Sequence, residues 1–160
     1  MATDIRSLNI SAVSDDWRGV ALSNFVLSPF ILEGRLFASV EGFIQGIKFP
    51  EQDPRRERAF TLSAWDAKKL GGEAGLEGVY WRGECLPYGS ERHHQLIASA
   101  IRARILQSEG LRQALISTQG LVLVHETGAP DSPKTSLPTP VFCRIINELR
   151  DELLSGAASA

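Results

Sequence analysis

The chain has 160 residues, of which 43% are hydrophobic and 22% charged, and its formal net charge at pH 7 is −2. These values are ordinary for a globular domain and exclude disordered, collagen-like and low-complexity chains. No apolar run approaches the ~20 residues of a membrane span, and the small charge gives no overall attraction to nucleic acid or membranes, although it is compatible with a local basic groove. The N-terminus has acidic residues and no apolar signal-peptide core, and the chain has two cysteines, so we expect a cytoplasmic protein with reduced thiols.

The first predicted elements are strands. Residues 9–14 alternate weakly between apolar and polar side chains, which predicts a short strand. Residues 29–38 hold two apolar runs on either side of Glu33-Gly34. A glycine at that point supplies the positive φ of a tight turn, so this segment predicts a β-hairpin.

A helix is predicted to begin at Ser39 and to end before Pro50. Ser39 is a good N-cap, and Glu41 falls in the first turn, where the helix dipole favours a carboxylate and should keep it ionised. Gly42 and Gly46 are four residues apart and share one face of this helix. We therefore expect another segment to approach the backbone closely there.

The rest of the chain reads as mainly helical. Periodicity, caps and glycine breaks predict a helix from Asp53 to Gly71 and then a glycine-rich loop over 71–90 with a strand at 79–82. A long helix is predicted from Ser90 to about Gln107, ended by Gly110, and a short helix over 111–117. A buried strand over 121–124, a loop over 125–136 and a last helix from about Pro138 to Leu153 complete the prediction. The expected fold class is α+β: a mainly helical single domain over 1–155 with a small β-sheet, followed by a frayed tail over 156–160.

Few residues carry a recognisable chemical pattern. His93 and His94 are adjacent on a predicted helix and point about 100° apart, and Cys85 and Cys143 lack a ligand spacing, so we expect no metal site and no cofactor. Phosphate-binding glycine motifs and nucleophile elbows are absent from the sequence.

Two polar segments leave alternatives open. Glu41, Gln45 and Lys48 are spaced to line one helix face, which is either a solvated stripe or the wall of a ligand cleft with the carboxylate as its reactive group. The polar loop from His125 to Pro138 is either a binding loop or a plain connection. Spacing alone does not decide between these interpretations.

The chain resembles the NADAR (NAD and ADP-ribose) superfamily, which includes YbiA-like proteins and an N-glycosidase of riboflavin-pathway intermediates. The first half of the resemblance rests on Ser23-Asn24-Phe25, Pro29-Phe30, Gly34, Phe37, Ser39-Val40-Glu41, Gln45 and Lys48-Phe49. The second half rests on Ala67, Leu70-Gly71, Ala100–Ile105, Leu111-Arg112, Thr118 and Leu149-Arg150. Departures are Gly42 in place of the family's histidine, His125 where many members have glutamate, and a rebuilt segment from Pro130 to Pro138.

The resemblance implies a YbiA-like fold and an N-glycosidase acting on a ribose-phosphate or ADP-ribose-type substrate, such as ADP-ribosylated guanine or a riboflavin precursor. Its partner would be a small nucleotide or an ADP-ribosylated nucleic-acid base. Glu41 is the expected catalytic carboxylate, and Asp131 a second one. The expected substrate-binding residues are Ser23, Asn24, Phe25, Gln45, Lys48, Trp81, Tyr88, His125, Lys134 and Thr135. The alternative is a non-catalytic module that binds NAD-derived nucleotides, which the rebuilt second half favours.

From the residues themselves, we expect Thr135 or Ser136 to cap the last helix. The free N–H groups of that helix end, with Lys134 beside them, would then form a phosphate site.

Overall fold

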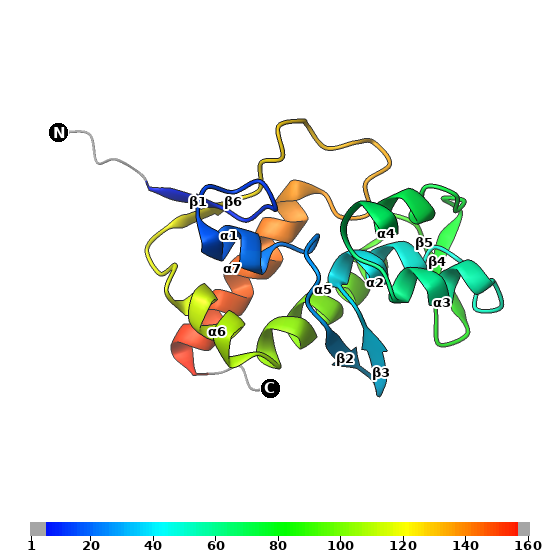
Figure 1. Cartoon of the computed structure of the whole chain (residues 1–160), viewed down its shortest axis with the longest axis horizontal. Helices are drawn as coiled ribbons and strands as arrows, with labels where there is room; N and C mark the ends of the chain where they lie inside the picture. The colour runs from blue at the N-terminus through cyan, green and yellow to red at the C-terminus, as the bar shows by residue number, and fades with distance from the viewer. Residues whose placement is uncertain (1–5, 157–160) are drawn as a thin grey trace. The chain divides into compact units, whose positions relative to one another are not determined.

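The structure, a computed structural model, describes residues 6–156. These residues group into two compact units, which are described separately (Figure 1). The first unit takes 6–23, 105–131 and 138–156, and the second takes 24–104 and 132–137. That the whole of 1–155 is one domain stays a prediction, and residues 157–160 of the expected frayed tail lie outside the described residues.

The second unit holds two hairpins. Strands β2 (Phe30–Leu32) and β3 (Arg35–Phe37) pair antiparallel, and Glu33 and Gly34 between them have φ values of 52° and 79°. This confirms the predicted hairpin. Strands β4 (Gly78–Trp81) and β5 (Glu84–Pro87) form the other hairpin, of which the sequence predicted only the first strand.

Helix α2 (Val40–Gly46) begins as predicted, because Ser39 Oγ accepts a hydrogen bond from the Gly42 N–H at 2.8 Å. The predicted close approach is also confirmed. A Cβ on Gly42 would lie 2.5 Å from the Leu62 carbonyl oxygen, and one on Gly46 would lie 2.4 Å from the Phe60 ring. The two glycines therefore let α2 pack directly on the segment that follows it.

The single helix predicted from Asp53 to Gly71 was wrong. The chain forms α3 (Pro54–Phe60), capped by Asp53, and then α4 (Ala64–Gly71). The break has a tertiary cause, since Ala64 takes a φ of 51° and its N–H donates to the Phe25 carbonyl oxygen at 2.9 Å. The long helix α5 (Glu91–Leu106) matches the prediction and runs from the second unit into the first.

Aromatic rings fill the core of the second unit. The rings of Phe37 and Phe60 meet edge to face with centroids 4.8 Å apart, and Phe43 meets Phe37 in the same way at 5.1 Å. Arg56 is buried beside them and donates to the carbonyl oxygens of Phe49 at 3.0 Å and Tyr80 at 2.9 Å. This packing fixes α2, α3 and the β4–β5 hairpin against one another.

In the first unit, β1 (Ser7–Asn9) pairs parallel with β6 (Val122–Val124), and three helices accompany them (Figure 1). The helices are α1 (Trp17–Leu22), which was not predicted, α6 (Glu109–Ile116) and α7 (Thr139–Ser155). The strand predicted over 9–14 was largely wrong, because the chain turns after Ile10, where Ser14 N–H donates to the Ser11 carbonyl. Gly110 lies inside α6, which Ser108 caps through the Leu111 N–H.

The fold class is α+β with mainly helical elements, as predicted. The described residues hold three two-stranded sheets instead of one small sheet. Cys85 and Cys143 are both free. No helix in the described part of the chain has the length and apolar character needed to span a membrane.

Candidate functional site

Glu41 lies in the first turn of α2 and is held by two hydrogen bonds. Its backbone N–H donates to the Asn24 carbonyl oxygen at 2.9 Å, and its Oε1 accepts from Gln45 Nε2 at 2.8 Å. Gln45 is buried, and its Oε1 lies so close to Gly71 that a Cβ on that glycine would be 1.8 Å away. The helical spacing thus places Gln45 on Glu41 itself, where it orients the carboxylate.

The electrostatics of Glu41 run against the effect of its helix position, which by itself would lower the pKa. Burial raises the pKa of Glu41, although the Gln45 hydrogen bond and the charges of Lys68 and Lys48 act in the opposite direction. Burial likewise lowers the pKa of Lys48, which the Glu41 carboxylate partly offsets. Desolvation outweighs the opposing favourable interactions at Glu41, and a carboxyl with a raised pKa is suited to proton transfer.

His93 is a candidate that the sequence reasoning missed. The side chain is fully buried, and its Nδ1 accepts a hydrogen bond from the Gly89 N–H at 3.0 Å. An accepting Nδ1 means a neutral ring with its proton on Nε2. Burial, together with His94 and Lys48, lowers the pKa of His93 to about 4, in agreement with that tautomer. The sequence offered no signal beyond a histidine near a helix start.

Buried polar atoms in the second unit lack hydrogen-bond partners. Within the described part of the chain, Asn24 Oδ1 and His93 Nε2 are inaccessible to water and make no hydrogen bond. Most buried polar atoms in folded proteins are paired, so such atoms call for an explanation. Asn24 adjoins Glu41 through its backbone, and His93 is coupled electrostatically to Lys48.

The other predicted residues of the second unit lie as follows. Tyr88 donates its hydroxyl to the Lys134 carbonyl oxygen at 2.6 Å and lies 2.9 Å from Ser136 Oγ, with its ring 5.0 Å from that of His93. Lys134 is exposed, and Thr135 Oγ1 accepts from the Leu137 N–H at 3.3 Å. Trp81 is partly buried against Phe43, with centroids 5.3 Å apart, so part of its ring belongs to the core.

Phe25 and Ser23 have structural contacts. The Phe25 ring meets Trp65 edge to face with centroids 5.1 Å apart. Ser23 belongs to the first unit, where it is buried and ends α1 with its N–H on the Val20 carbonyl. The structure thus brings Asn24, Glu41, Gln45 and Lys48 together, while Ser23 contributes as a helix cap.

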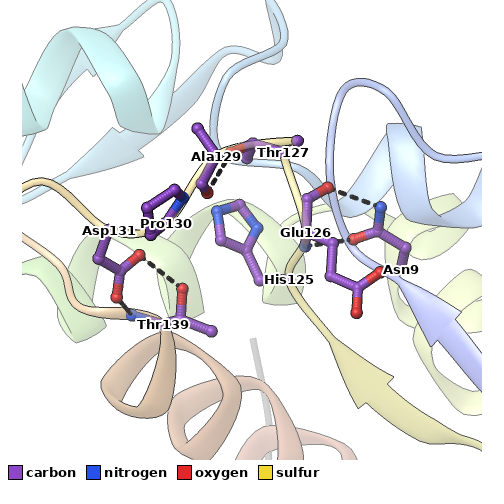
Figure 2. A pocket seen from close by; sticks show the side chains of 9 residues that line it. Asn9, His125, Glu126, Thr127, Ala129, Pro130, Asp131 and Thr139 are labelled. Atoms are coloured by element: carbon purple, nitrogen blue, oxygen red, sulfur yellow. Dashed lines mark hydrogen bonds between the residues drawn. The ribbon is translucent and has the colours of Figure 1, made fainter.

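The first unit has an open pocket of about 710 Å³ around His125 (Figure 2). His125 Nδ1 donates to the Ile10 carbonyl oxygen at 2.7 Å, and the ring meets Phe142 edge to face. In Figure 2 the imidazole lies between the Asp131–Thr139 pair and the Asn9–Glu126 pair. The pocket walls are mostly an exposed loop, whereas the buried, oriented carboxylate is Glu41.

Asp131 caps α7. Its Oδ2 accepts from the Thr139 N–H at 2.8 Å and its Oδ1 from the Thr139 hydroxyl at 2.7 Å, and these bonds lower the pKa of Asp131. The prediction that Thr135 or Ser136 caps this helix was wrong, because Pro138 is the N-cap residue and Asp131 supplies the carboxylate. Asp131 thus places a negative charge at this helix end, and phosphate binding by Lys134 stays a prediction.

Comparisons with known proteins place the chain. Residues 16–151 match the sequence family described as bacteriophage protein GP30.3. The chain is 33% identical over 142 residues to an uncharacterised 17.1 kDa protein of the Gp30-rIII intergenic region of Enterobacteria phage T4, covering 86% of this chain and 93% of that protein. The NMR structure of the E. coli protein YbiA shares the fold, with a TM-score of 0.68 over 97% of this chain and 89% of that one at 22% identity. The YbiA-like fold is thereby confirmed, and the chain belongs to the bacteriophage GP30.3 family.

Proposed function

We propose that this protein is an N-glycosidase that hydrolyses the bond between a base and the ribose of a ribose-phosphate or ADP-ribose-type substrate. The observation that carries the proposal is the Glu41 carboxyl, whose pKa burial raises and which Gln45 orients, on a residue whose N–H donates to the carbonyl of Asn24. The YbiA-like fold and the Ser39-Val40-Glu41 motif of the resemblance support it. A cytoplasmic location, expected from the reduced thiols, belongs to the same proposal.

The reaction needs a group that stabilises positive charge on the sugar. As the bond from the anomeric carbon to the base nitrogen breaks, the nitrogen keeps the electron pair and the sugar becomes oxocarbenium-like. The Glu41 carboxylate faces that charge and accepts a proton from the water whose oxygen bonds to the anomeric carbon. The departing nitrogen then takes a proton from solvent, and Glu41 releases the proton it accepted to solvent, which regenerates the carboxylate. Lys48 supplies positive charge for a substrate phosphate, while Asn24 Oδ1 accepts from a sugar hydroxyl.

Product release tests this assignment. The protein is incubated with NAD, ADP-ribose and ADP-ribosylated DNA, and freed base or ribose phosphate is separated by chromatography. We expect release by the wild type and by Glu148→Gln, an exposed carboxylate of α7 that serves as control. Glu41→Gln should lose about 100- to 10,000-fold of the release rate, the usual contribution of a general acid–base group. Wild-type turnover by Glu41→Gln would refute the assignment.

A non-catalytic nucleotide-binding module is the second candidate, and Asp131 is the observation that favours it. Both oxygens of that carboxylate bind Thr139, so Asp131 is already used as a helix cap. Hydrolysis would then depend on Glu41 as the reactive carboxylate. Binding of a nucleotide by calorimetry without release of any product would favour the module over the enzyme.

A further inference from the structure

Trp65 is an exposed tryptophan of the second unit, which also holds the Glu41 site (Asn24, Glu41, Gln45 and Lys48). It lies in the first turn of α4 and is 69% exposed. Phe25 meets its ring edge to face at 5.1 Å, and Lys68 Nζ lies 5.3 Å from the ring centroid. Single exposed apolar side chains are common on protein surfaces, so exposure alone identifies nothing. The connections of Trp65 to Glu41 set it apart.

Two separate paths connect Trp65 to the carboxylate. Along the backbone, Phe25 follows Asn24, whose carbonyl accepts from the Glu41 N–H, and the Phe25 carbonyl accepts from the Ala64 N–H at the start of α4. Through side chains, Lys68 lies over Trp65 and also acts electrostatically on Glu41. An exposed aromatic ring and a cation that acts on Glu41 are thus connected to the segment that holds Glu41 and Asn24.

This combination matches the chemistry of a nucleotide. Nucleobases stack on exposed aromatic rings regardless of their sequence identity, and a lysine ammonium serves as a point charge for phosphate. We propose that Trp65 stacks on a nucleobase and that Lys68 pairs with a phosphate of a nucleotide whose ribose occupies the Glu41 site. The proposal rests on the proposed function, to which it adds the base-stacking residue and the anion partner. Trp65 would therefore select substrates that carry a base next to the phosphate.

The chain contains its own control. Trp17, the first residue of α1 in the first unit, is 71% exposed, nearly the same as Trp65. Asp15, Asp16 and Arg18 line the same surface hollow, and Arg18 pairs with Asp16 at 2.7 Å, so Asp15 leaves the hollow with a net negative charge. A nucleotide phosphate would be repelled there. Comparing variants of the two tryptophans distinguishes base stacking on Trp65 from nonspecific binding to an exposed ring.

The test measures binding without turnover. In a Glu41→Gln background, calorimetry gives the Kd for ADP-ribose and for ribose 5-phosphate, which has no base. Trp65→Ala should weaken ADP-ribose binding by about 5- to 100-fold, Trp65→Phe should restore most of it, and Trp17→Ala should leave it unchanged. Ribose 5-phosphate should bind equally with and without Trp65. Lys68→Ala should weaken both ligands and flatten their salt dependence. A single-stranded oligothymidylate arm distinguishes a nucleotide within a strand from a free one.

The outcomes separate this inference from the proposed function. Equal ADP-ribose and oligonucleotide binding by the parent and by Trp65→Ala would overturn the inference, and so would equal losses in Trp17→Ala and Trp65→Ala. Neither result bears on the proposed glycosidase activity, which is tested by base release from the wild type. Binding that depends on Trp65 without any base release would uphold the inference and refute the glycosidase. Failure of both probes to bind would overturn the inference, while the release assay decides the activity.

Discussion

Acidification should destabilise the protein through His93. The folded-state pKa of this buried imidazole is about 4, whereas the ordinary value is 6.5. Well above pH 6.5 the ring is neutral in both the folded and the unfolded state, so His93 adds no pH dependence to the free energy of unfolding. As the pH falls below 6.5, the unfolded chain binds a proton that the folded chain does not, so stability falls until the folded ring also titrates near pH 4. At about 1.36 kcal/mol per pH unit, the difference between 6.5 and about 4 corresponds to about 3 kcal/mol.

The assay compares the wild type with His93→Asn. Asparagine keeps an acceptor for the Gly89 N–H but does not titrate, so its free energy of unfolding lacks this dependence. Urea unfolding at intervals from pH 7.5 to pH 4 gives the difference between the two proteins. Other titrating groups, Glu41 among them, cancel in that difference. We expect the wild-type advantage to stay constant above pH 6.5 and then to shrink by about 3 kcal/mol.

A difference that stays constant from pH 7.5 to pH 4 would refute this reasoning. It would mean that the folded protein binds a proton at His93 as readily as the unfolded chain does. The neutral ring with a free Nε2–H would then be lost as a feature of the site. If the prediction holds, His93 presents a hydrogen-bond donor whose state does not change at neutral pH.

Four further predictions test other parts of the structure. Glu41→Gln should melt at a higher temperature than the wild type at pH 8, because a raised carboxyl pKa means that ionised Glu41 destabilises the folded state. This gain in melting temperature should vanish below the ordinary pKa of 4.5, and a lower melting temperature at both pH values would contradict the prediction. Gly71→Ala should lose about 1–3 kcal/mol in urea unfolding, since its Cβ would lie 1.8 Å from Gln45 Oε1, whereas Gly72→Ala, with its nearest contact at 3.3 Å, is the matched control. Ile101→Ala and Ile146→Ala, 0% and 1% exposed, should each lose about 2–5 kcal/mol, and a loss below about 0.5 kcal/mol would show that the buried faces were misidentified. Asp131→Ala should lose about 0.5–2 kcal/mol in the same assay by removing the α7 cap, and an unchanged stability would argue against that role.

Local signals predicted the elements whose causes are local. The Glu33-Gly34 turn and the Ser39 cap each act within a few residues, and both were found as expected. The division between α3 and α4 could not be predicted, because nothing between Phe60 and Ala64 is a strong helix breaker. The Phe25 carbonyl, remote in sequence, takes the Ala64 N–H and holds that residue at a positive φ.

In the candidate site, too, the sequence predicted only the features that have local causes. The spacing of Glu41 and Gln45 predicted their proximity, since residues four apart meet on a helix. The raised pKa of Glu41 was not predicted, because burial depends on segments that the helix pattern does not contain. The capping of α7 by Asp131 bridges eight residues, beyond the reach of a cap motif.

The direction of the pKa shift of Glu41 bears on the role of this residue. A carboxylate kept for structural stability is stabilised in its charged form by its partners, and its pKa falls, as at Asp131 and Asp53. Glu41 also has a hydrogen-bond donor and two nearby cations, yet burial prevails and its pKa rises. Its ionised form therefore costs folding free energy, and Gly71 must stay small so that Gln45 can reach it. Perturbed carboxyls of this kind concentrate at sites of binding and catalysis, which agrees with the role proposed for Glu41.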